Sequence, residues 1–383
     1  MGSASVQPSI AVSRLLRQKR KEHRLTLREV SDRLAARGNR IPTSTLLRIE
    51  QGKLDPGVRR LHLLLDLYHV PPHLVADLME IETLAGQPPP EADLDTLYRT
   101  GLEHWKKGDV ARGLAHLFAI RERVPDGPPE RLLRQKATLS FAVAARNLGK
   151  FRLAKQIVDD LICEPPDESL LARVFVLASS LWRGLGSIEM ALALVRHAAT
   201  RVPPGGEKET AWVLHQEAKL LLELGRIDEA RRVLDGALAR YRSIPDTYGE
   251  ARAQVLGIAI EERREGLEQA IEHARQALAF AERCGHGRVA IAATLELGRL
   301  LVRSGAVEDG LNAVREGLGQ AVLVNDRGAE FLAHYQLWKI HERLGDSDRA
   351  TFELKAAAYF VQLVDDDTSE SAEVRALIRE GKA

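Results

Sequence analysis

The chain has 383 residues, of which 45% are hydrophobic and 28% are charged, and it contains only two cysteines. At about 150 residues per domain, this length predicts two or three folded units. The composition excludes collagen, disorder along the whole length, a disulfide framework and a four-thiolate metal site. The start of the sequence has no signal-peptide pattern and no run approaches about 18 apolar residues, so we expect a cytoplasmic protein without a membrane span.

Charge is distributed unevenly along the chain, although the formal net charge is only +1. Residues 1–70 contain 14 Lys and Arg against 6 Asp and Glu, whereas the remainder contains 41 against 48. A basic N-terminal part on a mildly acidic body indicates a module that binds a polyanion. The alternative is a basic surface that is only solvated.

The composition changes at the Pro-rich segment 86–91, where three consecutive prolines favour an extended spacer over a helix. We therefore predict a small domain at 8–85, a linker at 86–91, a large helical domain at 92–366, and a tail or capping helix at 367–383. No segment shows the alternating pattern of a strand, so both domains are predicted to be all-α.

The small domain is predicted to contain five short helices. Thr26 and Glu29 have the spacing of a capping box, in which each side chain satisfies a backbone N–H of the other residue, and they mark the start of the second helix. Gly38 and Asn39 are expected in a turn, and Gly52 is placed to end the third helix. The predicted helices cover 10–23, 26 to the turn, 43–51, 58–68 and 72 to about 84.

Two consecutive short helices joined by a tight turn are typical of a helix-turn-helix, whose second helix enters the major groove of DNA. Residues 14–70 resemble the Cro/repressor-type (Xre-like) family of such domains. The resemblance is carried by Leu16, Arg17 and Arg20, by the segments 25–31 (LTLREVS) and 44–53 (STLLRIEQGK), and by residues 61–70. It implies a structural pair between Glu50 and Arg20 that orients the recognition helix.

The same resemblance places base contacts on the third helix and phosphate contacts around it. Arg48 has the side chain to bind guanine through two hydrogen bonds, although an ordinary surface arginine is the alternative. The family's usual Gln at the start of the second helix is Leu27 here, so that phosphate contact is lost or passes to Arg28. The turn 36–42 is longer than usual, which leaves the alignment of Thr43 open by one residue. The predicted DNA-binding residues are Arg28, Thr43, Ser44, Thr45, Leu47, Arg48, Gln51 and Lys53, where the alternative for the residues at 43–45 is helix capping only.

Beyond the linker, short motifs of the form Gly-x-x-x-x-Ala, or close variants, recur every 37 to 41 residues. The first members are predicted to end a helix, and the small second members allow two paired helices to approach closely. A fixed period of this length predicts a solenoid of about seven helical hairpins. The first members are Gly108, Gly149, Gly186, Gly225, Gly266, Gly305 and Gly345, and the second members are Gly113, Ala154, Ala191, Ala230, Ala270, Gly310 and Ala350.

The spacing within a unit resembles the tetratricopeptide repeat. Signature positions are occupied by Gly101, Gly113, Leu114, Leu117, Ile120 and Pro125 in the first unit, and by Trp182, Ala191, Ala198 and Pro203 in the third. The period near 40 implies longer helices or loops than the standard repeat of about 34. The predicted fold is therefore all-α, with a five-helix DNA-binding head and a right-handed tetratricopeptide-type α-solenoid; a generic α-solenoid is the alternative.

In tetratricopeptide arrays the first helix of each unit lines the concave face, and the corresponding positions here are rich in Arg and Lys. They include Arg252, and they favour an extended peptide with acidic side chains or a free carboxylate. Asn147 is placed to bind a peptide backbone, whereas the carboxylate clamp of chaperone adaptors is not reproduced. Solvated charges without a ligand are the alternative. The predicted ligand-binding residues are Arg146, Asn147, Arg183, His215, Lys219, Arg263, Arg299 and Lys339.

No phosphate-binding loop, nucleophile motif or metal-ligand spacing stands out, so we expect no enzyme, no cofactor and no metal. His69 and His73 are separated by two prolines and cannot share one helical face. Cys163 and Cys284 are expected to be core thiols.

A DNA-binding head followed by tetratricopeptide repeats resembles the peptide-responsive (Rgg/PlcR-like) transcription regulators of bacterial quorum sensing. The resemblance implies a homodimer on double-stranded DNA, with a short peptide or a protein in the groove that changes DNA affinity. Two alternatives remain. One is a tetratricopeptide scaffold or adaptor that recruits a protein partner without ligand-controlled switching, and the other is a constitutive repressor whose repeats only dimerise.

Overall fold

The structure is a computed structural model that describes residues 8–86, 89, 93–123, 130–163, 166–364 and 368–382. The chain divides into two compact units, Met1–Gln87 and Pro88–Ala383. Within the described residues every regular element is a helix, which confirms the predicted all-α fold. Most of the predicted linker at 86–91 lies outside the described residues, as does Pro125.

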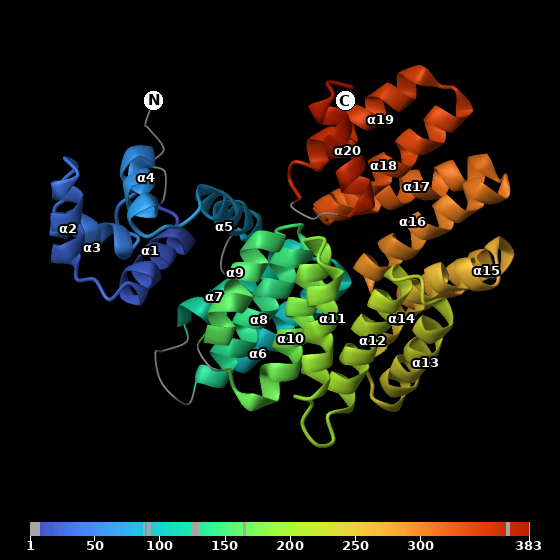
Figure 1. Ribbon diagram of the computed structural model, residues 1–383, viewed down its shortest axis with the longest axis horizontal. Helices are drawn as coiled ribbons and strands as arrows, with labels where there is room; N and C mark the ends of the chain where they lie inside the picture. The colour runs from blue at the N-terminus through green and yellow to red at the C-terminus, as the bar shows by residue number, and fades with distance from the viewer. Residues whose placement is uncertain are drawn as a thin grey trace. The chain divides into compact units, whose positions relative to one another are not determined.

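The first unit is a five-helix head (blue in Figure 1). Its core is built from apolar side chains of all five helices, and Val30 and Leu34 on the second helix are completely buried. The helices begin and end within one or two residues of the predicted positions. They are α1 (Ile10–Glu22), α2 (Leu27–Ala36), α3 (Thr43–Glu50), α4 (Gly57–Leu67) and α5 (Pro72–Ala85).

Two carboxylates organise helix starts in the head. The predicted capping box is confirmed: Oγ1 of Thr26 accepts from the Glu29 amide (3.2 Å), and Oε2 of Glu29 accepts from the Thr26 amide (2.7 Å). Glu82 on α5 accepts from the backbone amides of Ile10 (2.9 Å) and Ala11 (3.3 Å). Because free N–H groups and the helix dipole favour negative charge at this end, Glu82 fastens α5 to the start of α1.

The second unit consists of helical hairpins stacked in chain order, followed by one further helix, α20, that packs on α19 (Figure 1). The described residues form seven hairpins. Their first helices are α6 (Leu94–Lys107), α8 (Arg131–Asn147), α10 (Glu168–Gly184), α12 (Glu207–Glu223), α14 (Thr247–Arg264), α16 (Gly287–Ser304) and α18 (Arg327–Leu344). Their second helices are α7 (Val110–Arg123), α9 (Phe151–Cys163), α11 (Ile188–Ala199), α13 (Ile227–Ser243), α15 (Leu267–Arg283), α17 (Val307–Leu323) and α19 (Ser347–Phe360), and the last helix is α20 (Ser369–Arg379).

The repeated motif works as its residue types predict. All seven first-member glycines have positive φ, between 74° and 102°, at the turn between the two helices of a hairpin. Such a conformation is open to glycine without steric cost. The small second members permit close packing: Ala154 is completely buried, and a Cβ on Gly310 would lie 2.7 Å from the carbonyl oxygen of Gly298. The hairpins are therefore closed by steric complementarity at the positions that the sequence marks.

The array curves until its two ends meet. Each first helix from α8 to α18 packs against the next first helix, and α6 of the first hairpin packs against α16 of the sixth. At this closure Nη2 of Arg288 donates to the carbonyl of Asn147 (3.2 Å), and its guanidinium lies 4.9 Å from the ring centre of Trp105. Nζ of Lys150 donates to the carbonyl of Leu363 (3.1 Å). The first helices thus line the inner side of the repeat unit.

The two cysteines are not core thiols, contrary to expectation. Cys163 is exposed and Cys284 is half-buried, and both are free. Each stands at the end of a helix, Cys163 as the last residue of α9 and Cys284 as the C-cap of α15.

Candidate functional site

The recognition helix α3 is held by its buried face and by one ion pair. Leu46 and Ile49 are almost completely buried in the head. Nε and Nη2 of Arg20 donate to the two carboxylate oxygens of Glu50 at 2.7 and 2.8 Å, and Nη1 of Arg20 donates to the carbonyl of Leu25 (2.8 Å). The hydrogen bond to Glu50 raises the pKa of Arg20. The predicted structural pair is confirmed, and it ties α3 to α1 in a fixed orientation.

The opposite face of α3 is open to solvent. Leu47 is 44% exposed, which is unusual for a leucine in a helix whose other apolar residues are buried. Among the predicted DNA-binding residues, Thr45 is half-buried and the others are exposed: Arg28, Thr43, Ser44, Leu47, Arg48, Gln51 and Lys53. The N-cap of α3 is Pro42 and no side chain caps this helix, so the alternative that the residues at 43–45 serve only as caps is wrong.

The turn between α2 and α3 is fixed from inside. The hydroxyl of Ser31 on α2 donates to the carbonyl of Ile41 (2.6 Å), and both residues are buried. Gly38 takes positive φ (75°), whereas Asn39 does not. A turn that is longer than usual for the family is therefore still anchored to α2, and α3 starts at Thr43 as predicted.

All eight predicted ligand-binding residues lie on first helices, and five of them gather at one place. Nη1 of Arg146 on α8 donates to the hydroxyl of Ser180 on α10 (3.1 Å), and its Nε donates to Oδ1 of Asn147 (3.0 Å). Nη1 of Arg183 on α10 donates to Glu223 at the end of α12 (2.7 Å). The members of this interior charge cluster are Arg146, Asn147, Arg183, His215 and Lys219, joined by Arg252 of α14.

Electrostatic interactions across the interior connect the members of the cluster. Burial lowers the pKa of Arg146 to about 9, with further contributions from Arg252 and Arg183, so its guanidinium remains charged at neutral pH. The charge of Arg183, followed by burial, lowers the pKa of Lys219 well below its ordinary value, and Glu223 opposes this effect. Burial and then Arg252 lower the pKa of His215, which is neutral at pH 7 as a result. Cations from α8, α10, α12 and α14 therefore share one region.

The three remaining predicted ligand-binding residues already have partners in the chain. Nη1 of Arg263 donates to the carbonyl of Leu222 (2.9 Å). Arg299 forms ion pairs with Glu262 (2.6 Å) and Glu296 (2.8 Å). These two arginines cross-link neighbouring first helices or turns of one helix.

The third of these residues, Lys339, contacts the last helix. Its Nζ donates to Glu373 of α20 (3.2 Å) and lies 4.5 Å from the ring centre of Trp338. The hydroxyl of Tyr335 donates to the same carboxylate (2.6 Å). The carboxylate that a ligand was expected to supply at this position comes from the chain itself.

Arg252 was expected to line the groove but was not among the predicted ligand-binding residues, and Arg288 was not predicted at all. Arg252 has the position of a groove-lining residue but no feature that distinguishes it from its neighbours. Arg288 lies in the first turn of α16, pairs with Asp326 (2.5 Å) and acts on Arg146 of α8. No spacing in the sequence signals this contact, because it exists only through the curvature of the whole array.

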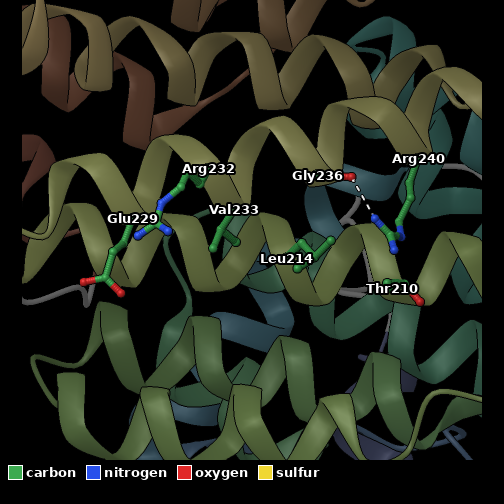
Figure 2. A pocket seen from close by; sticks show the side chains of 7 residues that line it. All are labelled: Thr210, Leu214, Glu229, Arg232, Val233, Gly236 and Arg240. Carbon is green, nitrogen blue, oxygen red and sulfur yellow. Dashed lines mark hydrogen bonds between the residues drawn. The ribbon is translucent and has the colours of Figure 1, made fainter.

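A surface hollow of about 420 Å³ lies between α12 and α13 (Figure 2). Thr210 and Leu214 line it from α12 and Val233 from α13, and Nη1 of Arg240 donates to the carbonyl of Gly236 at its edge (3.2 Å). It contains no member of the interior charge cluster. We assign no function to it.

Neither a metal site nor a membrane-spanning helix is found within the described part of the chain. No group of three or more His, Cys, Asp or Glu side chains is arranged to hold a metal ion. None of the described helices is both long enough and apolar enough to cross a membrane.

The head matches one family model. Residues 11–78 match a family model described as a helix-turn-helix domain. These residues cover α1 to most of α5 and include α3 with its exposed outer face. No curated protein matches the chain.

Several solved structures share the general arrangement at low sequence identity. One is PlcR from Bacillus thuringiensis, solved with the peptide PapR7 and DNA (13% identity, 74% of this chain and 99% of that chain, TM-score 0.46). A second is a tetratricopeptide repeat protein from Parabacteroides merdae (15% identity, 75% of this chain and 98% of that chain, TM-score 0.43). A third is the pheromone receptor Rgg2 from Streptococcus dysgalactiae (13% identity, 74% of this chain and 97% of that chain, TM-score 0.27). The chain carries a helix-turn-helix domain followed by tetratricopeptide-like helical hairpins.

Proposed function

We propose that the protein is a sequence-specific DNA-binding regulator of transcription in the cytoplasm. The observation that carries the proposal is α3, whose exposed face presents Arg48, Leu47 and Ser44 while the Arg20–Glu50 pair fixes its orientation. A helix of this size enters the major groove, where an arginine binds guanine through two hydrogen bonds. The basic charge of residues 1–70 supports the same proposal, because phosphate contacts supply most of the non-specific affinity.

The repeat unit is proposed to dimerise and to bind a peptide or protein ligand that changes DNA affinity. A single small head binds DNA weakly, and two heads on a pseudo-palindromic site combine their contacts. The interior charge cluster supports a ligand on the inner face. A ligand alters DNA affinity only as far as it binds the DNA-competent and the DNA-incompetent conformations differently.

Selection from a pool of randomised duplexes tests DNA recognition by the full-length protein. We expect one enriched motif, and inverted half-sites within it if two heads bind together. Arg48→Ala should lose about 1–3 kcal/mol of binding free energy and relax the preference at one base pair. The control is Arg196→Ala, which removes one exposed arginine from α11 in the repeat unit and should select the same motif as the wild type.

Two outcomes would contradict the proposal. Selection without any enriched motif would favour a scaffold that recruits a protein partner. An identical motif and affinity for Arg48→Ala would show that α3 does not contact bases. Native mass measurement in the same buffers tests the homodimer separately, since a monomer at the concentrations that bind DNA would remove dimerisation from the proposal.

A further inference from the structure

Four basic side chains from four consecutive hairpins interact electrostatically within the repeat unit. They come from α8, α10, α12 and α14, and they are Arg146, Arg183, Lys219 and Arg252. A hydrogen bond from Arg146 to Ser180 connects α8 with α10, and an ion pair from Arg183 to Glu223 connects α10 with α12. The closure of the array confines these groups, because Arg288 links the start of α16 to the end of α8.

The cluster holds more positive than negative charge. Glu223 pairs with Arg183, whereas Lys219 and Arg252 form no hydrogen bond or ion pair with another described residue. Arg146 donates to neutral groups only, the amide oxygen of Asn147 and the hydroxyl of Ser180. Arg146 and Arg252 therefore lack a carboxylate partner in the described part of the chain, and the single carboxylate of Glu223 interacts with both Arg183 and Lys219.

Two buried polar atoms of the cluster have no hydrogen-bond partner in the described part of the chain. Nε of Arg183 and Nδ1 of His215 are buried without a hydrogen-bond partner, and His215 is only 8% exposed. Buried polar atoms are nearly always satisfied in native proteins, so each exception requires an explanation. Mutual repulsion and desolvation of like charges destabilise the fold, and removal of such charges commonly stabilises a protein at the expense of its function.

We propose that the interior charge cluster binds an oxyanion group with at least two negative charges, supplied either by a phosphate or by a pair of carboxylates. Guanidinium groups match both chemistries, because their N–H donors bind two oxygens at once. The side chains of Arg146, Lys219 and Arg252 are half-buried. This inference deepens the ligand part of the proposed function and rests on it.

The anion connects hairpins two to five by binding side chains from each of them. Its negative charges offset the repulsion between side chains from α8, α10, α12 and α14. Without the anion, this repulsion is not compensated. Binding therefore stabilises the closed arrangement of these hairpins relative to any more open one, and this difference is what a regulatory ligand requires.

The test uses the melting temperature and calorimetric affinity of the full-length protein without DNA. The probes are inorganic pyrophosphate and a tetraglutamate peptide, each compared with sodium chloride at equal ionic strength. We expect one probe to raise the melting temperature above the chloride value, and the effective probe identifies phosphate or carboxylate as the source. Lys219→Met and Arg252→Gln should weaken its binding about tenfold or more, since each removes a charge-assisted hydrogen bond.

Control variants separate binding from folding. Arg275→Gln removes an exposed arginine from α15 of the same hairpin as Arg252 and should bind the probe like the wild type. Lys219→Arg should retain the affinity because it keeps the positive charge. Without any probe, Lys219→Met and Arg252→Gln should melt at a higher temperature than the wild type, because they relieve repulsion. This increase also shows that the two variants are folded.

The inference is overturned if neither probe raises the melting temperature above the chloride value, or if Lys219→Met and Arg252→Gln bind as tightly as Arg275→Gln. Failure here is distinct from failure of DNA recognition, because this measurement contains no DNA and the duplex selection contains no anion probe. A protein that selects a duplex motif but ignores both anions contradicts only the present inference.

Discussion

The side chain of Glu50 fixes the orientation of the recognition helix. Its carboxylate is 7% exposed and accepts from two nitrogens of Arg20, which is 16% exposed. A paired guanidinium and carboxylate at this depth stabilise each other, whereas either one alone is left with an uncompensated, desolvated charge.

Glu50→Ala should therefore destabilise the head by about 2–3 kcal/mol and increase amide exchange in α1 and α3, because Arg20 loses its partner. Hydrogen exchange measured on peptides from 8–86 localises the effect. The control is Asp66→Ala, which breaks the exposed pair between Arg37 and Asp66 (2.7 Å) and should cost less than about 1 kcal/mol. Equal exchange in the two variants would mean that the Arg20–Glu50 pair does not hold α3.

At the scale of elements, the hairpin turns combine a backbone requirement with a packing requirement. Every first-member glycine has the left-handed conformation, but the surroundings of these glycines differ. A Cβ on Gly149 would lie 2.3 Å from Cγ1 of Val364, whereas one on Gly225 would meet no atom within 4 Å. The turn after α8 therefore belongs to the closure of the array, and the turn after α12 does not.

This difference yields a matched pair of variants. Gly225→Ala should cost about 1 kcal/mol for the backbone conformation alone. Gly149→Ala should cost about 1–3 kcal/mol more, because the added methyl group overpacks the contact with Val364. Denaturant unfolding followed by tryptophan fluorescence measures both, since all four tryptophans lie in the repeat unit. Equal costs would show that the turn after α8 is free of the closure contact.

At the scale of the whole repeat unit, closure depends on Arg288. Its guanidinium is almost buried, pairs with Asp326, donates to the carbonyl of Asn147 and stacks on Trp105. These partners belong to the first, second and seventh hairpins or the turns beside them, and Arg288 itself begins the sixth. One side chain thus connects segments that are far apart in sequence.

Arg288→Ala should loosen the closure and destabilise the repeat unit by about 2–4 kcal/mol, because it leaves Asp326 buried without its partner. Amide exchange should increase in α6 and at the end of α8, and the affinity of the interior charge cluster for its anion should fall. Arg275→Ala, which removes an exposed side chain, is the control. Unchanged exchange at 94–107 in Arg288→Ala would mean that other contacts hold the ends together.

Local signals in the sequence determined most of the architecture. The capping box of Thr26 and Glu29, the Arg20–Glu50 pair and the glycines of the hairpin turns were all predictable, because each depends on residues within one motif or one short domain. Helix ends and hairpin turns obey local stereochemistry, and a period of about 40 residues counts the hairpins directly.

The tertiary structure alone decided which charged residues share a site. The sequence placed eight groove residues on first helices, yet five of them meet in the interior and three are engaged by Leu222, Glu262 or Glu373. Arg252, expected only as one groove-lining residue among many, belongs to the cluster, and Arg288 acts on Arg146 without any local signature in the sequence. The physical reason is that a small bend at each of seven hairpins accumulates over the array, so the distance between α8 and α14 or between α6 and α16 is a property of the total curvature.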